Sequence, residues 1–425
     1  MSVVLPRFLS DAAIIPRRRF LQLAAVGLVT ASRPASALFR LSNPCLDPAD
    51  TPLSALETAA WQGIDPADWW DCHTHIVGSG DSGSGITQSP DMHAPFRHPL
   101  QTLQHWAYAN AACIADTDQD RAFVRRLRAL MDTLPKGAKA MLYAFDRAHG
   151  ASGDPDHANT AFFVPNAYAQ SLAQAYPERF EWVASIHPYR RDCVAALEQA
   201  AANGARAVKW LPPVMGIDPA SPLCDRFYKA AAALNMPIIT HGGEENALHG
   251  ADQAMFGNPL RLRRALDAGV RIVIAHCASL GQDVDEDGRE VRSFDLFARL
   301  MAEKQWQDQL FGDISAIVLR NRDMGVIKTL LTETAWHGRL LYGSDYPLTG
   351  ILPLISPQAF ADAGLLAEDA IEPLLALQDY HPFRFDFVLK RSLSWQGKRF
   401  ANGIFATRRF FSCQPEHTNI SPARL

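Results

Sequence analysis

Several common sequence signals are missing from this chain, and each absence narrows what the protein can be. Its 41 basic and 45 acidic residues nearly balance, so nothing suggests nucleic acid as a partner. Its seven cysteines include no Cys-x-x-Cys pair, and no internal repeat is visible. Charged residues make up 20% and hydrophobic residues 48%, which favours a large core over disorder. At 425 residues the chain has a length that single α/β barrels routinely reach.

The amino terminus also lacks a long apolar run. The basic segment 17–19 precedes an uncharged stretch over residues 23–32, which is too short to span a bilayer comfortably. With the small residues of 35–37, this pattern describes an export signal, and its paired arginines resemble the twin-arginine type. Cleavage after Ala37 would leave a periplasmic protein without a stable membrane span, whereas an uncleaved segment would tether it. An ordinary disordered or amphipathic terminus is the alternative.

The stretch Asp71-Cys72-His73-Thr74-His75 places two imidazoles two residues apart at the end of an apolar run. Residues i and i+2 of a strand point to the same face, so both rings could reach one ion. Neutral imidazole is a preferred ligand of zinc and its first-row neighbours. Alone, the pair is only suggestive, because such pairs also arise by chance.

Three later segments follow the same plan, in which a short aliphatic run leads to a potential ligand. They end at His241, His276 and Asp345. Continuous apolar runs suit strands that are buried on both faces, as in a parallel sheet covered by helices. Polar groups at the ends of such strands meet at the mouth of a (β/α)8 barrel, where barrel enzymes carry their chemistry. The predicted fold class is therefore α/β, a (β/α)8 TIM barrel.

The chain is predicted to have four regions: an export signal over 1–37, an N-terminal cap or linker over 38–66, the barrel over 67–395 and a tail packed on the barrel over 396–425. Further strands are predicted over 138–145, 181–187, 205–210, 310–314 and 340–344, with helices over 118–134 and 193–203. This alternation favours βα units. The glycine-rich segment 78–85 lacks the ending of a P-loop and is interpreted as a mobile active-site loop.

Two cysteines neighbour potential ligands. Cys72 and Cys277 are predicted to be small buried thiols that pack outward between strand and helix. A disulfide between Cys45 and Cys413, outside the barrel at either end, could form in an oxidising compartment.

The ordered set of His-x-His, His, His and Asp, each at a strand end, resembles the amidohydrolase superfamily and in particular its amidohydrolase-2 branch of metal-dependent hydrolases and decarboxylases. The resemblance spans roughly Trp69 to the mid-390s, and the segment 381–391 is similar to the closing helix of this family. It implies one divalent ion per chain, with zinc preferred and manganese or iron as alternatives. Its implied ligands are His73, His75, His241 and Asp345.

The resemblance also implies roles for neighbouring residues. Asp345 would shuttle a proton from the nucleophile to the leaving group, and His276 would polarise the substrate, handle protons or bind a second metal. Lys209 ends the fourth predicted strand, where binuclear members often carry a carboxylated lysine. We favour a plain cation at Lys209, because this branch of the family is mostly mononuclear. Substrate contacts are predicted at His187, Trp210 and Arg190, each with a structural or solvated role as the alternative.

Three functions from different classes are consistent with these residues. The first is metal-dependent hydrolysis of an amide, lactone or ester bond in a small molecule, with metal-activated water as the nucleophile. The second is non-oxidative decarboxylation or hydration of a small carboxylic acid at the same site, which a carboxylate-binding Arg or Lys in the pocket would favour. The third is a non-catalytic exported binding protein on a barrel scaffold, for which lost ligands would be the sign, and none is missing. A homo-oligomer is compatible with all three.

Overall fold

The computed structural model describes residues 42–52, 54–115 and 117–412. The chain divides into a unit of residues 1–40 and a unit of residues 41–425, and the fold belongs to the second. The predicted export signal lies outside the described residues, as does Cys413.

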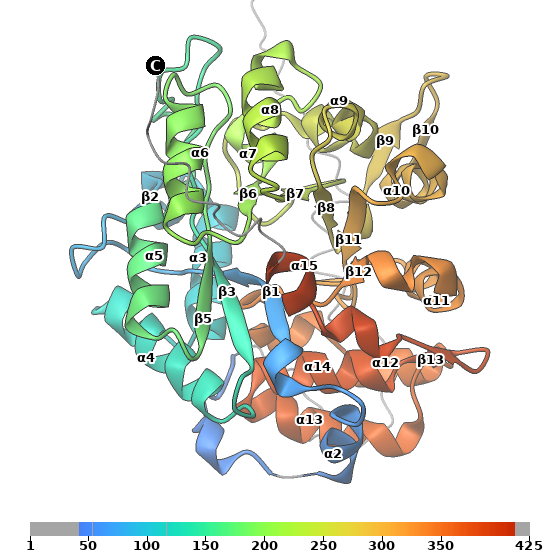
Figure 1. Ribbon diagram of the computed structural model, residues 1–425. Coiled ribbons are helices and arrows are strands. Elements are labelled where there is room, and N and C mark those ends of the chain that lie inside the picture. Colours follow the sequence, from blue (N-terminus) through green and yellow to red (C-terminus); the bar gives the residue numbers. More distant parts are fainter. Residues whose placement is uncertain (1–41, 53, 116, 413–425) are drawn as a thin grey trace, which may run out of the picture. The chain divides into compact units, whose positions relative to one another are not determined.

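Within the described residues, eight parallel strands form the centre of the fold (Figure 1). Their bounds are β1 Trp70–His75, β3 Lys139–Tyr143, β5 Phe180–Val183, β6 Val208–Trp210, β7 Ile238–His241, β8 Ile272–Ala275, β11 Leu310–Asp313 and β12 Leu340–Leu341. They pair in the orders β1-β3-β5 and β6-β7-β8-β11-β12. Parallel bridges of Ala184 with Val208 and of Thr74 with Tyr346 join the two sheets at both ends. The predicted (β/α)8 barrel is therefore confirmed.

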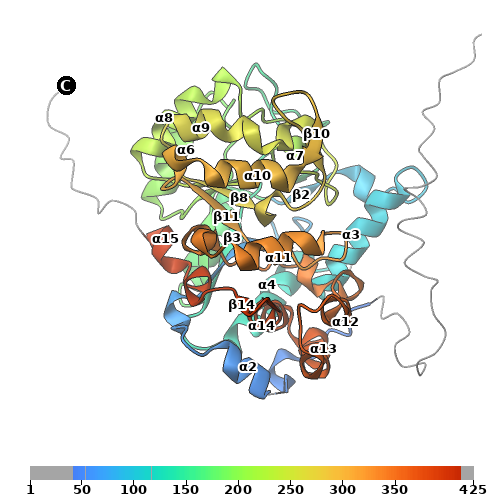
Figure 2. The same cartoon turned by 90° about the vertical axis from the view of Figure 1, so that its right-hand side faces the viewer.

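Helices follow the barrel strands along the chain and surround them (Figures 1 and 2). Their bounds are α2 Ala55–Ala60, α3 Pro99–Ala111, α4 Gln119–Asp132, α5 Asn166–Ala175, α6 Cys193–Ala202, α7 Pro212–Met215, α8 Asp225–Ala233, α9 Arg263–Asp267, α10 Ser293–Ala302, α11 Met324–Thr332, α12 Pro357–Asp362, α13 Ile371–Tyr380, α14 Pro382–Ser392 and α15 Arg408–Ser412. The predicted helices over 118–134, 193–203 and 381–391 correspond to α4, α6 and α14. None of the described helices combines the length and apolar character that crossing a bilayer requires.

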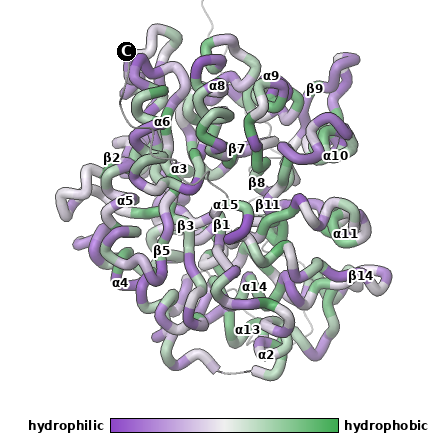
Figure 3. Tube along the Cα trace, in the orientation of Figure 1, coloured by the Kyte–Doolittle hydropathy of each residue, from purple (hydrophilic) through white to green (hydrophobic). Residues whose placement is uncertain are grey.

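Three short antiparallel pairs of strands lie outside the barrel sheet, within the described residues. β2 Thr87–Gln88 pairs with β4 Phe162–Phe163, β9 Gln282–Val284 with β10 Glu290–Arg292, and β13 Ser394–Trp395 with β14 Lys398–Arg399. In Figure 3 the strands near β8 are coloured as hydrophobic, whereas the outer turn next to β9 is hydrophilic. The core thus follows the strands, as expected for a sheet buried on both faces.

The segment before the barrel packs against the closing helix. α2 contacts α14, and α14 in turn contacts α13, so these helices form one layer (Figure 2). A buried ion pair joins them, because Arg384 Nε donates to Glu57 Oε1 at 2.6 Å. Burying two charges is tolerated only where they are paired and hydrogen-bonded, as they are here. At the other end of the chain, Phe411 of α15 packs into the barrel interior, and α15 lies near the middle of the ring in Figure 1.

The outward orientation predicted for Cys72 is wrong. Asp71 pairs with Ala140 and Thr74 with Leu142, so β1 carries one extra residue between these pairs. Such a bulge re-aims the side chains that follow it. Cys72 therefore packs inside the barrel with Trp70, and His73 can still face the interior. Cys277 lies in the outer core cluster, as predicted.

The predicted partner of Cys45 is also wrong. Cys45 forms a disulfide with Cys113, which lies just after α3 and 68 residues away in sequence. The two segments are also held together by Asn43, whose backbone N–H donates to Asn110 Oδ1 at 2.8 Å. The barrel insertion that contains α3 thus brings Cys113 to the N-terminal segment, which no local pattern in the sequence indicates.

The segment 78–85, predicted to be a mobile loop, is fastened to the first turn of α4. The Asp120 carboxylate accepts hydrogen bonds from the backbone of Ser79, Gly80 and Ser82 at 2.9, 3.0 and 3.2 Å. In return, Asp81 accepts from the backbone N–H groups of Gln119 and Asp120. The glycine-rich segment, which follows β1 in the chain, is therefore hydrogen-bonded to the start of α4.

Candidate metal centre

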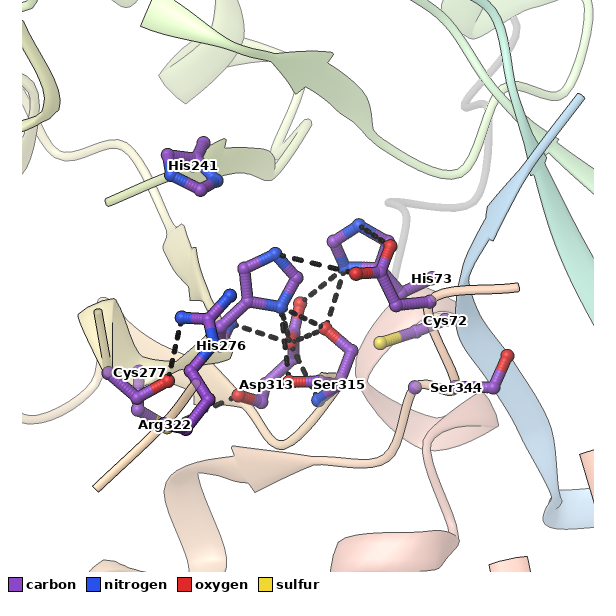
Figure 4. Close-up of polar contacts among 12 residues, drawn as sticks. Cys72, His73, His241, His276, Cys277, Asp313, Ser315, Arg322 and Ser344 are labelled. Carbon is purple, nitrogen blue, oxygen red and sulfur yellow. Dashed lines mark hydrogen bonds and ion pairs between the residues drawn. The ribbon is translucent and has the colours of Figure 1, made fainter. Parts of the chain in front are cut away.

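Three side chains from separate strand ends converge at the mouth of the barrel, and Figure 4 shows two of them, His73 and His276. His73 belongs to β1, His276 follows β8 and Asp345 follows β12, and all three are buried. One nitrogen or oxygen atom of each lies within 4.8 Å of those of the other two. His75 adds a fourth group, because its Nε2 lies 3.1 Å from Asp345 Oδ1 while its side chain remains 31% exposed.

The backbone leaves the extended conformation at two of these residues. The φ angles of His276 and Asp345 are 57° and 66°, in the left-handed region that non-glycine residues seldom adopt. Hydrogen bonds hold both turns: the His276 N–H donates to Asp313 Oδ1 at 2.9 Å, and the Asp345 N–H donates to His73 O at 2.9 Å. The surrounding structure therefore determines where these side chains point, as is common at functional sites.

Asp71 ties the first and last barrel strands together beside these residues. Its Oδ1 accepts from the backbone N–H of His73 at 3.0 Å and from that of Ser344 at 2.9 Å. Asp71 is fully buried, and this burial raises its pKa to about 7. Because Ser344 directly precedes Asp345, one carboxylate holds both segments that supply the candidate ligands.

Neighbouring acceptors select the tautomers of both buried imidazoles. His73 Nδ1 lies 2.9 Å from Asp313 Oδ2, and His276 Nδ1 lies 3.1 Å from the carbonyl oxygen of Ser315. An Nδ1–H that donates to each of these acceptors leaves Nε2 with a free lone pair. Orientation of metal-binding histidines by a carboxylate or carbonyl on the other ring nitrogen is the usual arrangement at metal sites.

The ionisation states also suit a metal ion. Burial lowers the pKa of His73 to about 4, and the charge of Lys209 adds to this effect. Burial likewise lowers the pKa of His276 well below its ordinary value. Burial alone would raise the pKa of Asp345, but His73 and His276 outweigh it and hold that pKa well below the usual range. At neutral pH the three groups are two neutral imidazoles and one carboxylate, the forms that bind divalent metals.

An unsatisfied buried oxygen provides the clearest sign of a metal site. Asp345 Oδ1 is buried and accepts no hydrogen bond of good geometry, although His75 Nε2 and His73 Nε2 lie 3.1 and 3.4 Å away. A buried charged oxygen without a partner is costly unless something else compensates it. A cation would bind to these facing electron-pair donors and compensate the buried charge. The residues present therefore fit a divalent ion.

Lys209, at the centre of β6, points toward the same group. Its Nζ lies 3.3 Å from His73 Nε2, the side chain is 2% exposed, and burial lowers its pKa. The structure thus brings the predicted lysine to the metal centre, and its role as plain cation or carboxylated ligand stays a prediction.

His241, at the end of β7, lies next to the three-residue group without belonging to it. Its ring centroid is 5.5 Å from that of His276. Its Nε2 lies 3.2 Å from the carbonyl oxygen of Glu244, and its Nδ1 lies 3.4 Å from Glu245 Oε2. His241 therefore lines the mouth, and its role as a ligand stays a prediction.

The predicted substrate contacts His187 and Trp210 are not brought to the metal centre. Both ring nitrogens of His187 are engaged, Nε2 with Met215 O at 3.0 Å and Nδ1 with the Tyr189 N–H at 3.2 Å. Trp210 is fully buried in the outer core, where its ring packs 5.2 Å from that of Phe227 on α8. His187 therefore matches its structural alternative, hydrogen bonding within the barrel top, whereas the buried Trp210 differs from the solvated alternative expected for it.

Arg190 lines a different cavity, of about 450 Å³, whose walls include none of the candidate ligands. Its guanidinium pairs with Asp146 at 2.9 Å and with Asp192 at 2.7 Å. Two carboxylates therefore already satisfy the charge that was predicted to contact substrate.

Sequence reasoning missed several residues at the mouth. Asp313 ends β11, within the predicted strand 310–314, so the rule that identified the other strand ends also applies to it. Ser315 Oγ lies 3.0 Å from His73 Nδ1 and 2.7 Å from His276 Nδ1, but a serine in a loop gives no such signal. The same holds for Tyr108 of α3, which donates to Ala247 O at 2.8 Å beside the mouth.

The barrel and the buried cluster of imidazole and carboxylate groups at its mouth define the class of metal-dependent α/β-barrel enzymes. The amidohydrolase-2 family model, described as Amidohydrolase, matches residues 70–374, which is most of the chain. The protein therefore belongs to this amidohydrolase family.

Several solved structures resemble the chain. One is a TIM-barrel protein of Bordetella bronchiseptica described as uncharacterized, with 16% identity over 73% of this chain and 99% of that chain, and a TM-score of 0.45. Another is a probable 2-pyrone-4,6-dicarboxylic acid hydrolase from Acinetobacter baumannii, with 16% identity, 75% and 97% coverage, and a TM-score of 0.41. A third is a 5-carboxyvanillate decarboxylase from Novosphingobium aromaticivorans, with 12% identity, 81% and 96% coverage, and a TM-score of 0.41. No curated protein matches the sequence.

Proposed function

We propose that this protein is a metal-dependent hydrolase that acts on an amide, lactone or ester bond of a small molecule. The observation that carries the proposal is the buried Asp345 carboxylate, whose Oδ1 faces His73 Nε2 and His75 Nε2 without accepting a hydrogen bond. His73, His75 and Asp345 would hold one divalent ion, with His241 completing the set. Zinc is the favoured ion, and manganese or iron are alternatives.

The bound ion supplies a Lewis acid that lowers the pKa of water from about 15.7 to about 7. Asp345 can receive a proton on Oδ1 or Oδ2 and return it to the leaving group. His276 Nε2 lies 3.8 Å from Asp345 Oδ2, so its lone pair can accept a proton at the same place. Asp313, which accepts from His73 Nδ1, would leave the Nε2 lone pair of His73 to hold the ion.

Non-oxidative decarboxylation of a small carboxylic acid is the second candidate, and one observation favours it. Two cationic side chains, those of Lys209 and Arg322, act electrostatically on the buried cluster, because each is attracted by the charges of Asp313 and Asp345. A cation near the metal would bind a substrate carboxylate. Both reactions would use the same ligands, so the reaction products must separate them.

Export to the periplasm is part of the proposal. The Cys45–Cys113 disulfide supports it, because such bonds persist in oxidising compartments and are rare in the cytosol of mesophiles. Mass spectrometry of protein recovered from the periplasm should find a new amino terminus after Ala37, and exchange of Arg17 and Arg18 for lysine should abolish export. Full-length protein in the cytoplasm with both arginines intact would contradict this part.

Metal analysis tests the catalytic proposal first. Plasma mass spectrometry on protein purified without added metal should give about one ion per chain, and His73→Ala should lose it. Lys209→Ala should keep the ion if Lys209 is a plain cation, whereas a drop from two ions to one would establish a bridging carboxylated lysine. His157→Ala, which alters an exposed histidine, is the matched control and should change nothing. No metal in the parent after reconstitution would refute the enzyme mechanism.

Activity screening then separates the two reactions. Lactones, amides and esters in water enriched with ¹⁸O should yield labelled acid if the protein is a hydrolase. A decarboxylase would instead release CO₂ from a carboxylic acid, and its organic product would carry no ¹⁸O label.

A further inference from the structure

Arg322 carries a charge that the described residues do not pair. It lies between β11 and α11, and its Nη1 donates to Ser279 Oγ at 2.9 Å (Figure 4). Its Nε is buried and has no hydrogen-bond partner. Among the residues that the structure describes, Arg322 makes no ion pair, although part of its side chain stays accessible to solvent.

The surroundings of this guanidinium are those of the metal centre. The charges that attract it belong to Asp345, Glu245 and Asp313, in that order, yet burial outweighs them and lowers the pKa of Arg322. Its own charge lowers the pKa values of His241 and His276. Figure 4 shows the guanidinium beside His276.

The nearby carboxylates are already engaged by other groups. Glu245 faces His241 Nδ1 at 3.4 Å and accepts from the backbone N–H of Leu248 at 3.2 Å. Asp313 accepts from His73 and from the backbone of His276, and Asp345 faces the candidate metal ligands. None of these three carboxylates forms an ion pair with Arg322 in the part of the chain that the structure describes.

A guanidinium has five N–H donors arranged in a planar fork that matches the two oxygens of a carboxylate. Removing such a charge from water is unfavourable unless an anion compensates it. A bound anion would use the donors that Ser279 leaves free and would offset this cost. Lys209 lies at a different place, against His73, and presents a single ammonium rather than a fork.

We propose that Arg322 binds a carboxylate of the substrate, so that the substrates of this protein are small carboxylate-bearing molecules. The proposal rests on the proposed function, because it names the substrate class of the same metal centre. In a hydrolase this carboxylate would orient the molecule, and in a decarboxylase it would be the group that leaves as CO₂.

Binding of a simple anion tests the proposal without knowledge of the substrate. Benzoate is titrated calorimetrically into metal-loaded protein, and benzamide, its uncharged analogue, is titrated in parallel. Benzoate should bind and benzamide should bind at least about 10-fold more weakly, because a charge-assisted bidentate pair is lost. Arg322→Met should weaken benzoate about 10- to 100-fold and leave benzamide unchanged. Arg322→Lys should recover part of the affinity, since it keeps the charge without the fork.

Arg320→Met is the matched control, because Arg320 is an exposed arginine two residues away on the same loop. It should bind benzoate as the parent does. Unchanged benzoate affinity in Arg322→Met, equal loss in Arg320→Met, or no benzoate binding to the parent at millimolar concentration would each overturn the proposal. If Arg322→Met fails to fold, as judged by its thermal unfolding, Arg322→Gln takes its place.

Metal content is measured on the same samples, which keeps the two proposals distinguishable. A parent without metal after reconstitution refutes the proposed function whatever benzoate does. A parent that holds metal while Arg322→Met retains full benzoate affinity refutes only the role of Arg322. His73→Ala reports whether benzoate merely binds the ion, because such binding would vanish with the metal while Arg322 remains intact.

Discussion

Replacing Asp313 with asparagine should disable the metal centre while leaving every proposed ligand in place. Asp313 Oδ2 lies 2.9 Å from His73 Nδ1, and Oδ1 accepts from the backbone N–H groups of His276 at 2.9 Å and Ser315 at 3.0 Å. An asparagine can keep the two backbone hydrogen bonds through its carbonyl oxygen. Its amide N–H₂ would then face His73 and favour the tautomer with the proton on Nε2.

The magnitude follows from this change of tautomer. A proton on Nε2 removes the lone pair that His73 would offer to the ion, and loss of a hydrogen-bonding partner behind a ligand typically costs 10- to 100-fold in metal affinity. We therefore expect the dissociation constant of the ion to rise about 10- to 100-fold, equivalent to about 1.4–2.7 kcal/mol.

Competition with a chromophoric chelator measures this affinity for the parent, for Asp313→Asn and for Asp369→Asn. Asp369 is exposed, so its substitution removes the same charge far from the buried cluster and should leave the affinity unchanged. Thermal unfolding of the metal-free proteins serves as the check on folding. If Asp313→Asn folds and binds the ion as tightly as the parent, the argument that Asp313 orients His73 is wrong.

Three further predictions concern stability. In Gly343→Ala the new Cβ would lie 2.6 Å from His73 Cβ. We therefore expect the free energy of unfolding, measured in urea, to fall by about 1–3 kcal/mol and the amount of bound metal to decrease. Values equal to those of the parent would show that the strands can move apart to make room. Burial lowers the pKa of His381 to about 3, so the unfolded chain binds its proton first. His381 should therefore contribute a loss of about 3 kcal/mol of stability as the pH drops from about 7.5 to about 4.5. His381→Asn should show a shallower pH dependence over that window, and an equally steep one would exclude His381 as the cause. Substitution of both Cys45 and Cys113 with serine should cost about 4 kcal/mol in the same urea assay, and no loss would mean that the disulfide is not formed.

The sequence alone determined the class of fold and the places where chemistry could occur. Runs such as 271–276 are apolar throughout because both faces of a barrel strand are buried, and this requirement is local to each strand. A polar residue at the end of such a run has to leave the core, so His73, His276 and Asp345 could be assigned to the barrel mouth before any contact was known. Applied to strand 310–314, the same rule would have found Asp313.

Only the tertiary structure decided which of these residues meet and in what state. The bulge in β1 depends on its pairing with β3, and it turns Cys72 inward while His73 still reaches Asp313. The bond between Cys45 and Cys113 and the position of Arg322 beside His276 arise because the fold brings together segments that are far apart in the chain. Hydrophobic periodicity reports which way a side chain points within its own strand or helix, but register and long-range packing set the distances between side chains, and these distances decide the chemistry.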